Sequence, residues 1–401
     1  LAASCAVELA GAVAPETRCL IREAQRATPT PHKVFSMSIL NIMWAGGSAF
    51  ASVQKVHQQI LSHTDSGAPV HHWLLQGSAT GSDGLAEGAV EWNLSSAKLK
   101  GRHLWKWLMP WMHARFRKAL PDDLQVVLLD GIGVARVFLP VLKHLPHVRA
   151  VVIFHGATRL RGADQQLFDS FPASQLTVTA VSQTLAGSLE RDLKRPVVVL
   201  RSAFDPVVFR AAALSREQAR SRLDLSLEAA PAIGAVGRLV DGKGFACLVD
   251  AFATATADQP DARLVIIGEG PARPGLEARI EALGVRDKVS LPGHLPEAAS
   301  LYRAFDWVAI PSKEEGLGLI VQEAVMAGVP VLTSELAVFR EQLGDCGWYA
   351  PADDAASWSD LLTRALASSA EEVVEAQSRA LAPEQAWSDF TETTRRLFSC
   401  R

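Results

Sequence analysis

Two glutamates, Glu315 and Glu323, stand eight positions apart in the segment 311–330, which reads PSKEEGLGLIVQEAVMAGVP. A predicted strand ends just before this segment, and an apolar helix follows its Gly-Leu-Gly. Open N–H groups at the start of a helix form a site for an anion such as phosphate. The two carboxylates can accept hydrogen bonds from sugar hydroxyls. We therefore predict a nucleotide-sugar site, although the pair alone would also fit an acid/base pair or solvated helix charges.

Two cations, Arg238 and Lys243, stand five positions apart on a glycine-rich turn that reads GRLVDGKGF over 237–245. The turn joins a predicted strand to a predicted helix, which places it at the sheet edge where ligands bind. Two cations at this spacing can flank a diphosphate and neutralise the charge that grows on it as it leaves. The alternative is a pair of solvated loop cations. The spacing of a Walker loop is absent.

The first half of the chain offers Gly46 and Gly47 after one predicted strand, and His155 at the end of another. Glycines at such a turn let the backbone approach a donor phosphate or an acceptor. The alternative is that they are needed only for the conformation of the turn. A histidine at a strand end is also explained as a hydrogen-bonded residue at the edge of a cleft. No Asp-x-Asp occurs, so the usual carboxylate pair for a divalent metal on a diphosphate is lacking. We expect no metal and no cofactor.

Short apolar runs alternate with amphipathic segments from position 37 onward, which predicts an α/β fold with parallel sheets covered by helices. A length of 401 residues favours two domains, and the alternation pauses around 201–230. The expected units are an extension over 1–36, domains over 37–205 and 206–384, and a C-terminal helix over 385–401 with a place against the first domain. Strands are predicted over 37–43, 71–76, 125–130, 149–154, 176–181, 196–200, 231–236, 263–267, 288–291, 307–310 and 330–332, and helices over 49–62, 184–192, 211–223, 243–257, 275–283, 297–304 and 319–327.

The second half of the chain closely resembles the retaining glycosyltransferases of family 4. The matching stretches are GRLVDGKG, LVIIGEGP over 264–271, and VSLPGHLPEAASLYRAFDWVAIPSKEEGLGLIVQEAVMAGVPVL over 289–332. The resemblance is dense over 231–352 and weaker but collinear over 37–205. It implies the GT-B fold, in which two Rossmann-like domains with parallel sheets face each other across a central cleft.

The resemblance also implies roles for the matching residues. Arg238 and Lys243 would hold the donor diphosphate, and Glu323 would bind the ribose hydroxyls. His155 and Glu315 would contact the transferred sugar, and they are the expected catalytic residues. The other expected substrate contacts are Gly46 and Gly47, His294 near the base, and the backbone of Gly316, Leu317, Gly318 and Leu319.

The resemblance implies a retaining, metal-independent hexosyltransferase that uses a nucleoside-diphosphate sugar. A UDP-sugar is favoured over a GDP-sugar, and the acceptor is a lipid-linked glycan or an oligosaccharide. Such enzymes build lipopolysaccharide core or surface polysaccharide, which is the pathway we expect. A non-catalytic scaffold and a sugar-nucleotide epimerase on the same fold are the alternatives. The segment 201–205, RSAFD, departs from the family's Asn-Gly before an Asp, so the contacts on the hinge side stay open.

The segment 98–118 carries seven lysines and arginines, no acidic residue and three tryptophans. Cationic and aromatic side chains together suit the headgroup layer of an anionic membrane. They also suit single-stranded nucleic acid, and the tryptophans suit a helix packed on the core. We favour the membrane and expect no nucleic acid, because many members of the resembling family elongate lipid-anchored glycans. Pro110 predicts a kink in a helix here.

The bulk properties favour a cytoplasmic protein. A net charge of −3 gives no global attraction to nucleic acid or anionic lipid. Five scattered cysteines without a Cys-x-x-Cys argue for a reducing compartment and against a disulfide framework or a zinc site. No apolar run approaches the roughly 20 residues that span a bilayer, and the alanine-rich opening lacks the basic start of a signal peptide. We expect that the segment 98–118 binds the protein peripherally to the cytoplasmic face of the inner membrane.

Overall fold

The computed structural model describes residues 38–45, 50–64, 68–79, 88–95, 105–227 and 231–399. All of these belong to the unit Met37–Arg401. The expected extension over 1–36, the expected phosphate-side Gly46 and Gly47, and residues 98–104 of the basic segment lie outside the described residues.

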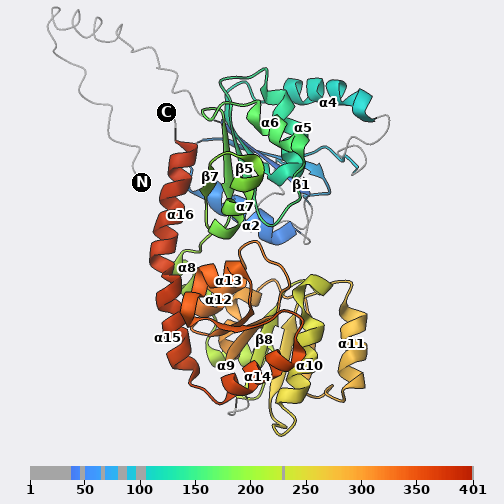
Figure 1. Ribbon diagram of the computed structural model, residues 1–401, viewed down its shortest axis with the longest axis vertical. Coiled ribbons are helices and arrows are strands. Elements are labelled where there is room, and N and C mark those ends of the chain that lie inside the picture. The colour runs from blue at the N-terminus through green and yellow to red at the C-terminus, as the bar shows by residue number, and fades with distance from the viewer. Residues whose placement is uncertain are drawn as a thin grey trace, which may run out of the picture. The chain divides into compact units, whose positions relative to one another are not determined.

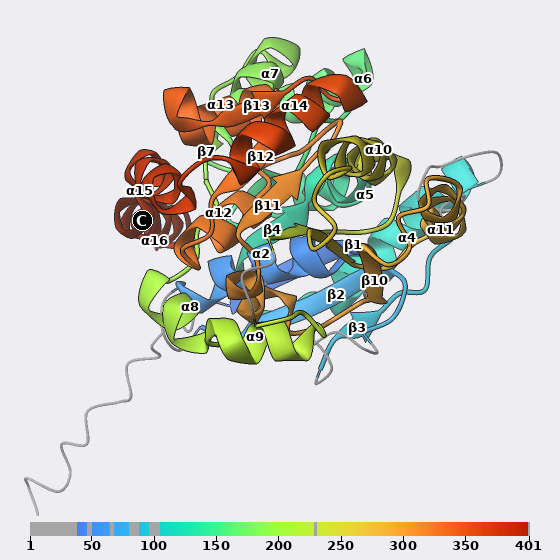
Figure 2. The same cartoon turned by 90° about the horizontal axis from the view of Figure 1, so that it is seen from below.

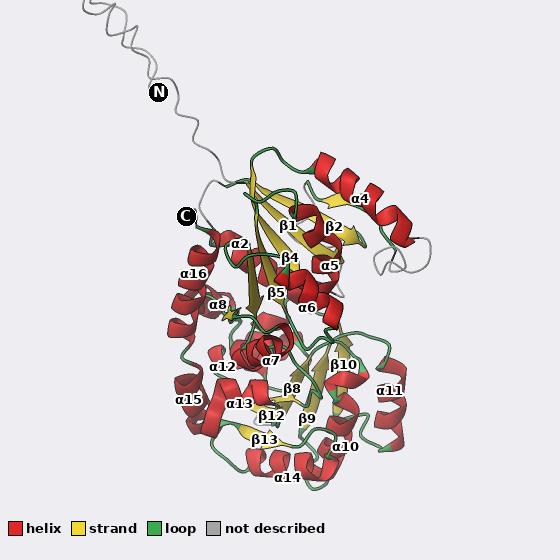
Figure 3. Cartoon of the chain, turned by 45° about the horizontal axis from the view of Figure 1, so that its top comes forward, coloured by secondary structure: helices red, strands yellow, loops and turns green. Residues whose placement is uncertain are grey.

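Two parallel sheets form the frame of this unit (Figures 1 and 3). The first orders its described strands β3-β2-β1-β4-β5-β6-β7, and the second orders its strands β10-β9-β8-β11-β12-β13. All neighbouring strands run parallel. The order reverses between β1 and β4 and between β8 and β11, and ligands of such sheets bind at the carboxyl ends beside that reversal. The predicted α/β fold with two Rossmann-like sheets is confirmed. The strands are β1 (Ser38–Ala45), β2 (Val70–Gln76), β3 (Val90–Glu91), β4 (Leu124–Asp130), β5 (Arg149–Phe154), β6 (Leu176–Ala180), β7 (Val197–Val199), β8 (Ala232–Val236), β9 (Arg263–Ile267), β10 (Val289–Gly293), β11 (Trp307–Ile310), β12 (Val331–Ser334) and β13 (Trp348–Ala350).

Helices connect the strands, as parallel neighbours require. None of the described helices combines the length and the apolar character that crossing a lipid bilayer requires. The helices are α2 (Ala51–Ser62), α4 (Trp105–Ala119), α5 (Gly131–Leu142), α6 (Gly162–Asp169), α7 (Gln183–Leu193), α8 (Pro206–Ala212), α9 (Arg216–Arg222), α10 (Phe245–Ala255), α11 (Arg273–Ala282), α12 (Leu319–Met326), α13 (Ala337–Leu343), α14 (Ala355–Leu366), α15 (Ala370–Leu381) and α16 (Pro383–Phe398), with short 3-10 turns η2 (Asp241–Lys243), η3 (Ala298–Ser300), η4 (Tyr302–Ala304) and η5 (Gly344–Cys346).

Strand β8 is apolar throughout because both of its faces are buried. Ile233 and Ala235 lie in one core with α10 and α14, which are neighbours in Figure 2. Ala232 belongs to a second core that includes residues of α12. Gly234 leaves room for a ring on that second face, since a Cβ there would lie 2.3 Å from the side chain of Phe305. This packing holds the carboxyl end of β8, and therefore the turn after it, in a fixed place.

Two helix predictions need correction. The predicted helix over 297–304 is wrong, because the segment forms the two 3-10 turns η3 and η4. The carbonyl of Ser300 accepts the N–H of Leu214 at 3.0 Å, so it is not available to continue an α-helix. The predicted helix over 211–223 is divided into α8 and α9. Helix α8 ends at Ala212, where Ala213 turns to an extended conformation, and Ser215 caps α9 by accepting the N–H of Gln218 at 3.3 Å.

The last two helices, α15 and α16, tie the end of the chain to both sheets (Figure 1). On α15, the buried Gln377 donates to the carbonyl of Val331 at 2.9 Å and accepts the Val331 N–H at 2.8 Å. Near the end of α16, Arg149 at the start of β5 donates to the carbonyl of Ser399 at 2.8 Å. Trp387 of α16 meets the ring of His63 edge-on, with centroids 4.7 Å apart.

We expect Gln377→Ala to lower the free energy of unfolding by about 2–4 kcal/mol, because it leaves the buried N–H and C=O of Val331 unpaired. Urea unfolding followed by circular dichroism measures this change. Gln385→Ala is the matched control on the exposed side of α16, with an expected change below about 0.5 kcal/mol. An equal effect of both substitutions would contradict this account of the α15 contact.

Candidate functional site

The turn that carries Glu315 packs directly on the end of β5. A Cβ at Gly316 would lie 1.7 Å from the carbonyl oxygen of His155 and 3.0 Å from Cα of Gly156, so only glycine fits there. The hydroxyl of Ser182, at the start of α7, donates to the Gly316 carbonyl at 2.9 Å. The two predicted catalytic residues, far apart in the sequence, are therefore brought to one place by backbone packing.

The helix α12 begins at this turn without a capping side chain. Its N-cap is Gly318, and within the described part of the chain no side chain accepts from the first N–H groups of the helix. Leu319 and Ile320 line the same small cavity as Lys243. The first N–H groups of a helix lack partners within the helix itself. The predicted anion site at the start of α12 therefore has the open geometry that a phosphate needs.

Lys243, on the glycine-rich turn after β8, forms an ion pair with Glu315, on the turn after β11. The Lys243 ammonium donates to Oε1 of Glu315, and the hydroxyl of Ser312 donates to the same oxygen at 2.9 Å. The two charged side chains are 22% and 13% exposed, so this is a largely sheltered pair. The glycine-rich turn reaches it because Gly244 has φ +69° and lies against the end of β11, where a Cβ would be 2.0 Å from the Pro311 carbonyl. The pair sets one cation and one carboxylate at the cavity that the start of α12 also lines.

Two other predicted contacts are exposed at the same edge of the second sheet. Arg238 follows the end of β8, and His294 follows the end of β10. Neither side chain forms a hydrogen bond or an ion pair with another described residue that would hold it in place. Arg238 was predicted on the turn after a strand, and the structure places it there, while His294 was expected only near the base and is found directly after β10.

Glu323 lies on α12, one turn after the open N-terminus, and is paired with a tyrosine. Tyr302 donates its hydroxyl hydrogen to Oε2 of Glu323 at 2.7 Å. Burial raises the pKa of Glu323, while the Tyr302 hydrogen bond and the charge of Lys55 act in the other direction. The pKa of Tyr302 is raised well above its ordinary value by burial and by the charge of Glu323. The Tyr302 hydrogen bond thus holds the Glu323 carboxylate in a fixed orientation.

His155 belongs to a buried polar cluster in the first sheet. Its Nε2 lies 3.0 Å from Nε2 of His57 and 3.9 Å from Oδ1 of Asp130. Burial lowers the pKa of His155 to about 4. Burial raises the pKa of Asp130 to about 6, although the hydrogen bond from the Trp44 N–H acts to lower this pKa. The pKa of His57 is lowered well below its ordinary value by burial, then by His155 and His72. Both rings of the His57–His155 pair are therefore neutral at physiological pH.

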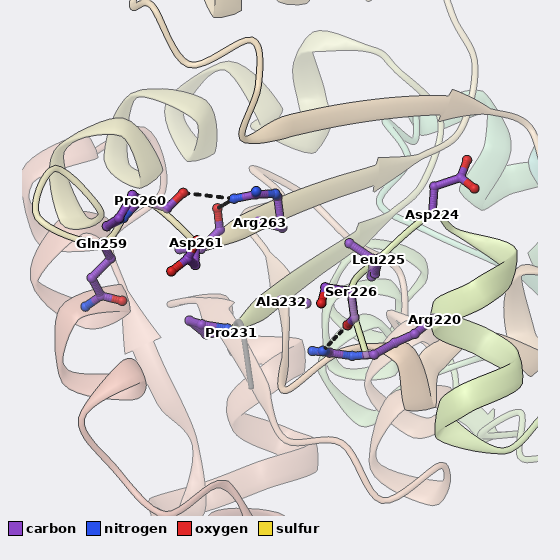
Figure 4. Close-up of a pocket in the computed structure, with 11 residues that line it drawn as sticks. Arg220, Asp224, Leu225, Ser226, Pro231, Ala232, Gln259, Pro260, Asp261 and Arg263 are labelled. Carbon is purple, nitrogen blue, oxygen red and sulfur yellow. Dashed lines mark hydrogen bonds between the residues drawn. The ribbon is translucent and has the colours of Figure 1, made fainter. Parts of the chain in front are cut away.

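A small cavity of about 200 Å³ joins His155, Lys243 and Glu315, whereas Arg238, His294 and Glu323 lie outside its lining. Its lining includes His155 and Ser202 from the first half and Lys243, Glu315 and the start of α12 from the second. A larger cavity of about 680 Å³ lies at the other end of the second sheet, at the amino ends of β8 and β9 (Figure 4). Its arginines are already bonded to carbonyls, for example Arg220 to Ser226 at 2.8 Å. The smaller cavity therefore marks the candidate site.

Several residues of the site have no signal in the sequence that identifies their role. Ser312 and Tyr302 lie within the resembling run, but only the fold shows that they hold Glu315 and Glu323. Ser182 and His57 carry no local signal that connects them with positions more than ninety residues away. Arg201 stands in the RSAFD segment, and its Nε and Nη2 are buried without a partner in the described part of the chain.

Residues 219–381 match the family model described as glycosyl transferases group 1. The 2-deoxystreptamine glucosyltransferase of Streptomyces kanamyceticus is 30% identical over 234 residues, which cover 54% of this chain and 60% of that relative. A D-inositol 3-phosphate glycosyltransferase of Corynebacterium urealyticum is 31% identical over 246 residues, covering 56% of this chain and 57% of that relative. The chain thus spans less than two thirds of the length of these curated relatives.

Solved structures match the fold over nearly the whole described unit. Sucrose-phosphate synthase from Thermosynechococcus elongatus aligns with a TM-score of 0.70 and 17% identity, covering 90% of this chain and 99% of that one. HepE of Anabaena in complex with UDP has a TM-score of 0.70 and 17% identity, covering 90% and 98%. WaaG, a glycosyltransferase involved in lipopolysaccharide biosynthesis, has a TM-score of 0.68 and 16% identity, covering 90% and 100%. These likenesses confirm the predicted GT-B fold.

We expect Glu323→Gln to stabilise the fold, because it removes a carboxylate whose ionisation is opposed by burial while Tyr302 can still donate to the amide oxygen. A raised pKa in the folded state lowers stability as the pH rises above the ordinary value of 4.5. The gain in melting temperature should therefore be full near about pH 8 and disappear toward about pH 4.5.

Thermal unfolding of both proteins across this pH range measures the difference. Glu392→Gln, on the exposed side of α16, is the control and should change little at any pH. Destabilisation by Glu323→Gln at about pH 8 would contradict the burial cost assigned to this carboxylate.

Proposed function

We propose that the chain is a retaining glycosyltransferase that moves a hexose-type sugar from a nucleoside diphosphate to a glycan acceptor. One observation carries this proposal: Lys243, Glu315 and the open start of α12 meet beside His155 at one small cavity. This arrangement offers a cation and a helix N-terminus to a diphosphate, and a carboxylate and an imidazole to a sugar. The match of 219–381 to group 1 glycosyl transferases includes the first three of these groups and supports the proposal.

In this proposal, these residues stabilise the negative charge that develops on the leaving diphosphate. As the bond from the anomeric carbon to the diphosphate oxygen breaks, negative charge grows next to Lys243, Arg238 and the first N–H groups of α12. The acceptor oxygen forms its new bond to the anomeric carbon on the same face, and its proton passes to the departing diphosphate, which retains the configuration. No Asp-x-Asp is available, so we propose that no metal ion is required on the diphosphate.

The two glutamates serve as binding groups in this mechanism. Glu315 is held by Lys243 and Ser312, and it is positioned to accept hydrogen bonds from the hydroxyls of the transferred sugar. Glu323, oriented by Tyr302, would hold the ribose. His155 is neutral and contacts the sugar. We propose a UDP-sugar donor, with His294 near the base, because the similar fold of HepE was solved with UDP and with UDP-glucose.

For the acceptor we propose a lipid-linked glycan or an oligosaccharide of lipopolysaccharide core or surface polysaccharide, with transfer on the cytoplasmic face of the membrane. The fold shared with WaaG, which is involved in lipopolysaccharide biosynthesis, supports this pathway. The described part of the basic segment adds a second argument. On α4, Leu108 and Trp111 are 43% and 59% exposed, beside exposed cations at Arg115 and Arg117.

Helix α4 combines a core-facing side with an exposed amphipathic side. Met112 and Phe116 are buried, and Phe116 packs edge-on against Trp92 at 4.5 Å between ring centroids. On the other side the Arg115 guanidinium lies over the ring of Trp111 at 5.0 Å. An exposed tryptophan flanked by arginines suits the headgroup layer of an anionic bilayer, where each cation contributes about 1 kcal/mol. We therefore propose that α4 contacts the membrane surface.

The transfer proposal is tested with UDP-, GDP- and ADP-glucose. A specific donor at a hundred times its dissociation constant should raise the free energy of unfolding by about 2.7 kcal/mol, which thermal shift detects. With that donor, Glu315→Gln should lower release of the nucleoside diphosphate by about 100-fold or more, because it removes a charged contact to the sugar. NMR of the product should show the anomeric configuration of the donor.

Glu314→Gln is the matched control, since Glu314 is the exposed neighbour of Glu315. Its turnover should stay close to that of the unchanged protein. Donor stabilisation without turnover would favour the non-catalytic scaffold, and interconversion of free sugar nucleotides would favour the epimerase. An inverted product would contradict the retaining mechanism.

We expect binding to vesicles that contain anionic phospholipid, and weaker binding as salt is raised, because the cations of α4 act through a screened potential. Trp111→Ala should lower the bound fraction in a sedimentation assay several-fold. Trp387→Ala, on α16, is the tryptophan control and should bind as the unchanged protein does. Equal binding to neutral and anionic vesicles would remove the membrane role of α4.

A further inference from the structure

The hydroxyl of Ser202 is a buried polar group that has no hydrogen-bond partner within the described part of the chain. Ser202 follows β7, in the RSAFD segment that departs from the resembling family, and the residue is 0% exposed. A buried hydroxyl without a partner costs free energy, and such groups are rare in folded proteins. The unpaired hydroxyl therefore requires an explanation, which the position of Ser202 in the fold supplies.

Ser202 lies at the cavity of about 200 Å³ that forms the candidate site. The lining of this cavity also includes Lys243, Glu315 and the first residues of α12. Arg201, the neighbour of Ser202, has two side-chain nitrogens without a partner among the described residues, but it does not belong to this lining. The cavity is thus the place from which a bound group can reach the Ser202 hydroxyl.

Two hydrogen bonds fix the backbone around Ser202 beside the start of α12. The carbonyl oxygen of Ser202 accepts from Nε2 of Gln322 at 2.9 Å, and Gln322 is a buried residue early in α12. The N–H of Leu200 donates to the carbonyl of Ala180 at 2.8 Å, which ties the end of β7 to β6. Ser202 is therefore held next to the helix N-terminus that the proposed function assigns to the donor diphosphate.

We propose that Ser202 is a further substrate-binding residue, whose hydroxyl donates a hydrogen bond to an oxygen of the donor diphosphate. This inference rests on the proposed function. Phosphate oxygens are charged acceptors, and a serine hydroxyl has one hydrogen to donate. The bond pairs the hydroxyl only while the donor is bound. The cost of the unpaired group is therefore carried by the ligand-free protein and is removed when the donor binds.

Two other arrangements of the Ser202 hydroxyl are distinguishable from this one. In the first it bonds a hydroxyl of the sugar, so that loss of the Ser202 hydroxyl would not change the affinity for UDP, which lacks the sugar. In the second it bonds a water molecule that stays in the cavity, so that the affinity for neither UDP nor UDP-glucose would change. The bond between Ser202 and Gln322 of α12 favours the diphosphate, because Glu315 and His155 are the groups assigned to the sugar.

The test compares Ser202→Ala with the unchanged protein by isothermal titration calorimetry, with UDP and with UDP-glucose. We expect the affinity for both ligands to fall by about 10–100-fold, the usual effect of losing a hydrogen bond to a charged group. The melting temperature of the ligand-free variant should stay the same or rise, because the substitution removes an unpaired buried hydroxyl. Ser202→Cys, which replaces the hydroxyl with a weakly donating thiol, should lose affinity in the same way.

Ser38→Ala is the matched control. Ser38 begins β1 at the amino end of the first sheet, outside the lining of the cavity, and its buried hydroxyl also lacks a partner among the described residues. Its ligand-free melting temperature should respond as that of Ser202→Ala does, and its affinity for both ligands should not change.

Unchanged affinity of Ser202→Ala for UDP would overturn the inference and leave the proposed transfer intact. A ligand-free melting temperature clearly below that of Ser38→Ala would also overturn it, because the hydroxyl would then have a partner within the protein. Failure of the unchanged protein to bind either UDP or UDP-glucose would contradict the proposed UDP-sugar donor, and this inference together with it.

Discussion

The close contact between Gly316 and the backbone of His155 is the constraint on which the rest of the site depends. A side chain at position 316 would overlap the His155 carbonyl, so the two turns can meet only through glycine. This contact sets the N-terminus of α12 and the carboxylate of Glu315 beside the end of β5. Ser182 strengthens it by donating to the Gly316 carbonyl. The site is thus built by backbone packing between segments that are far apart in the sequence, and the charged side chains are added to that frame.

The site also retains acids in places that oppose their ionisation. Burial raises the pKa of Asp130 to about 6 and also raises the pKa of Glu323. Each carboxylate has an orienting donor, the Trp44 N–H in one case and the Tyr302 hydroxyl in the other. Such groups lower the stability of the fold, and perturbed carboxylates of this kind gather at functional sites more often than elsewhere. Asp130 ends β4 of the first sheet, and Glu323 lies on α12, which follows β11 of the second sheet, so each half of the chain holds one such carboxylate.

The sequence predicted the frame better than its details. Runs of apolar residues between glycine-rich turns identified most strands, because both faces of these sheets are buried and the strands read as continuous hydrophobic stretches. The short edge strands β3 and β13 were missed, whereas β7, which is as short as β13, was predicted because it lies in the apolar run 197–200. The segment 297–304 has helical periodicity, yet tertiary hydrogen bonding at Ser300 makes it two 3-10 turns.

Some residues of the candidate site were predicted from the sequence, and others were found only in the structure. Arg238, Lys243 and Glu315 were predicted because they lie on turns that follow strands, and Glu323 because it lies one turn into the helix of the same dense motif. Tyr302 and His57 were not, because their partners are set by how the elements pack in space. The segment RSAFD also carried no visible reason for its departure from the resembling family. In the structure its Asp205 caps α8 by accepting two backbone N–H groups, and its Ser202 carbonyl accepts from the buried Gln322 of α12.

A structure of the protein with a non-transferable UDP-glucose analogue tests the central claim most directly. We expect diphosphate oxygens within hydrogen-bond distance of the Lys243 ammonium and of the first N–H groups of α12, with the sugar between Glu315 and His155. An analogue bound instead in the larger cavity at the amino ends of β8 and β9, beside Arg220 and Arg263, would contradict it.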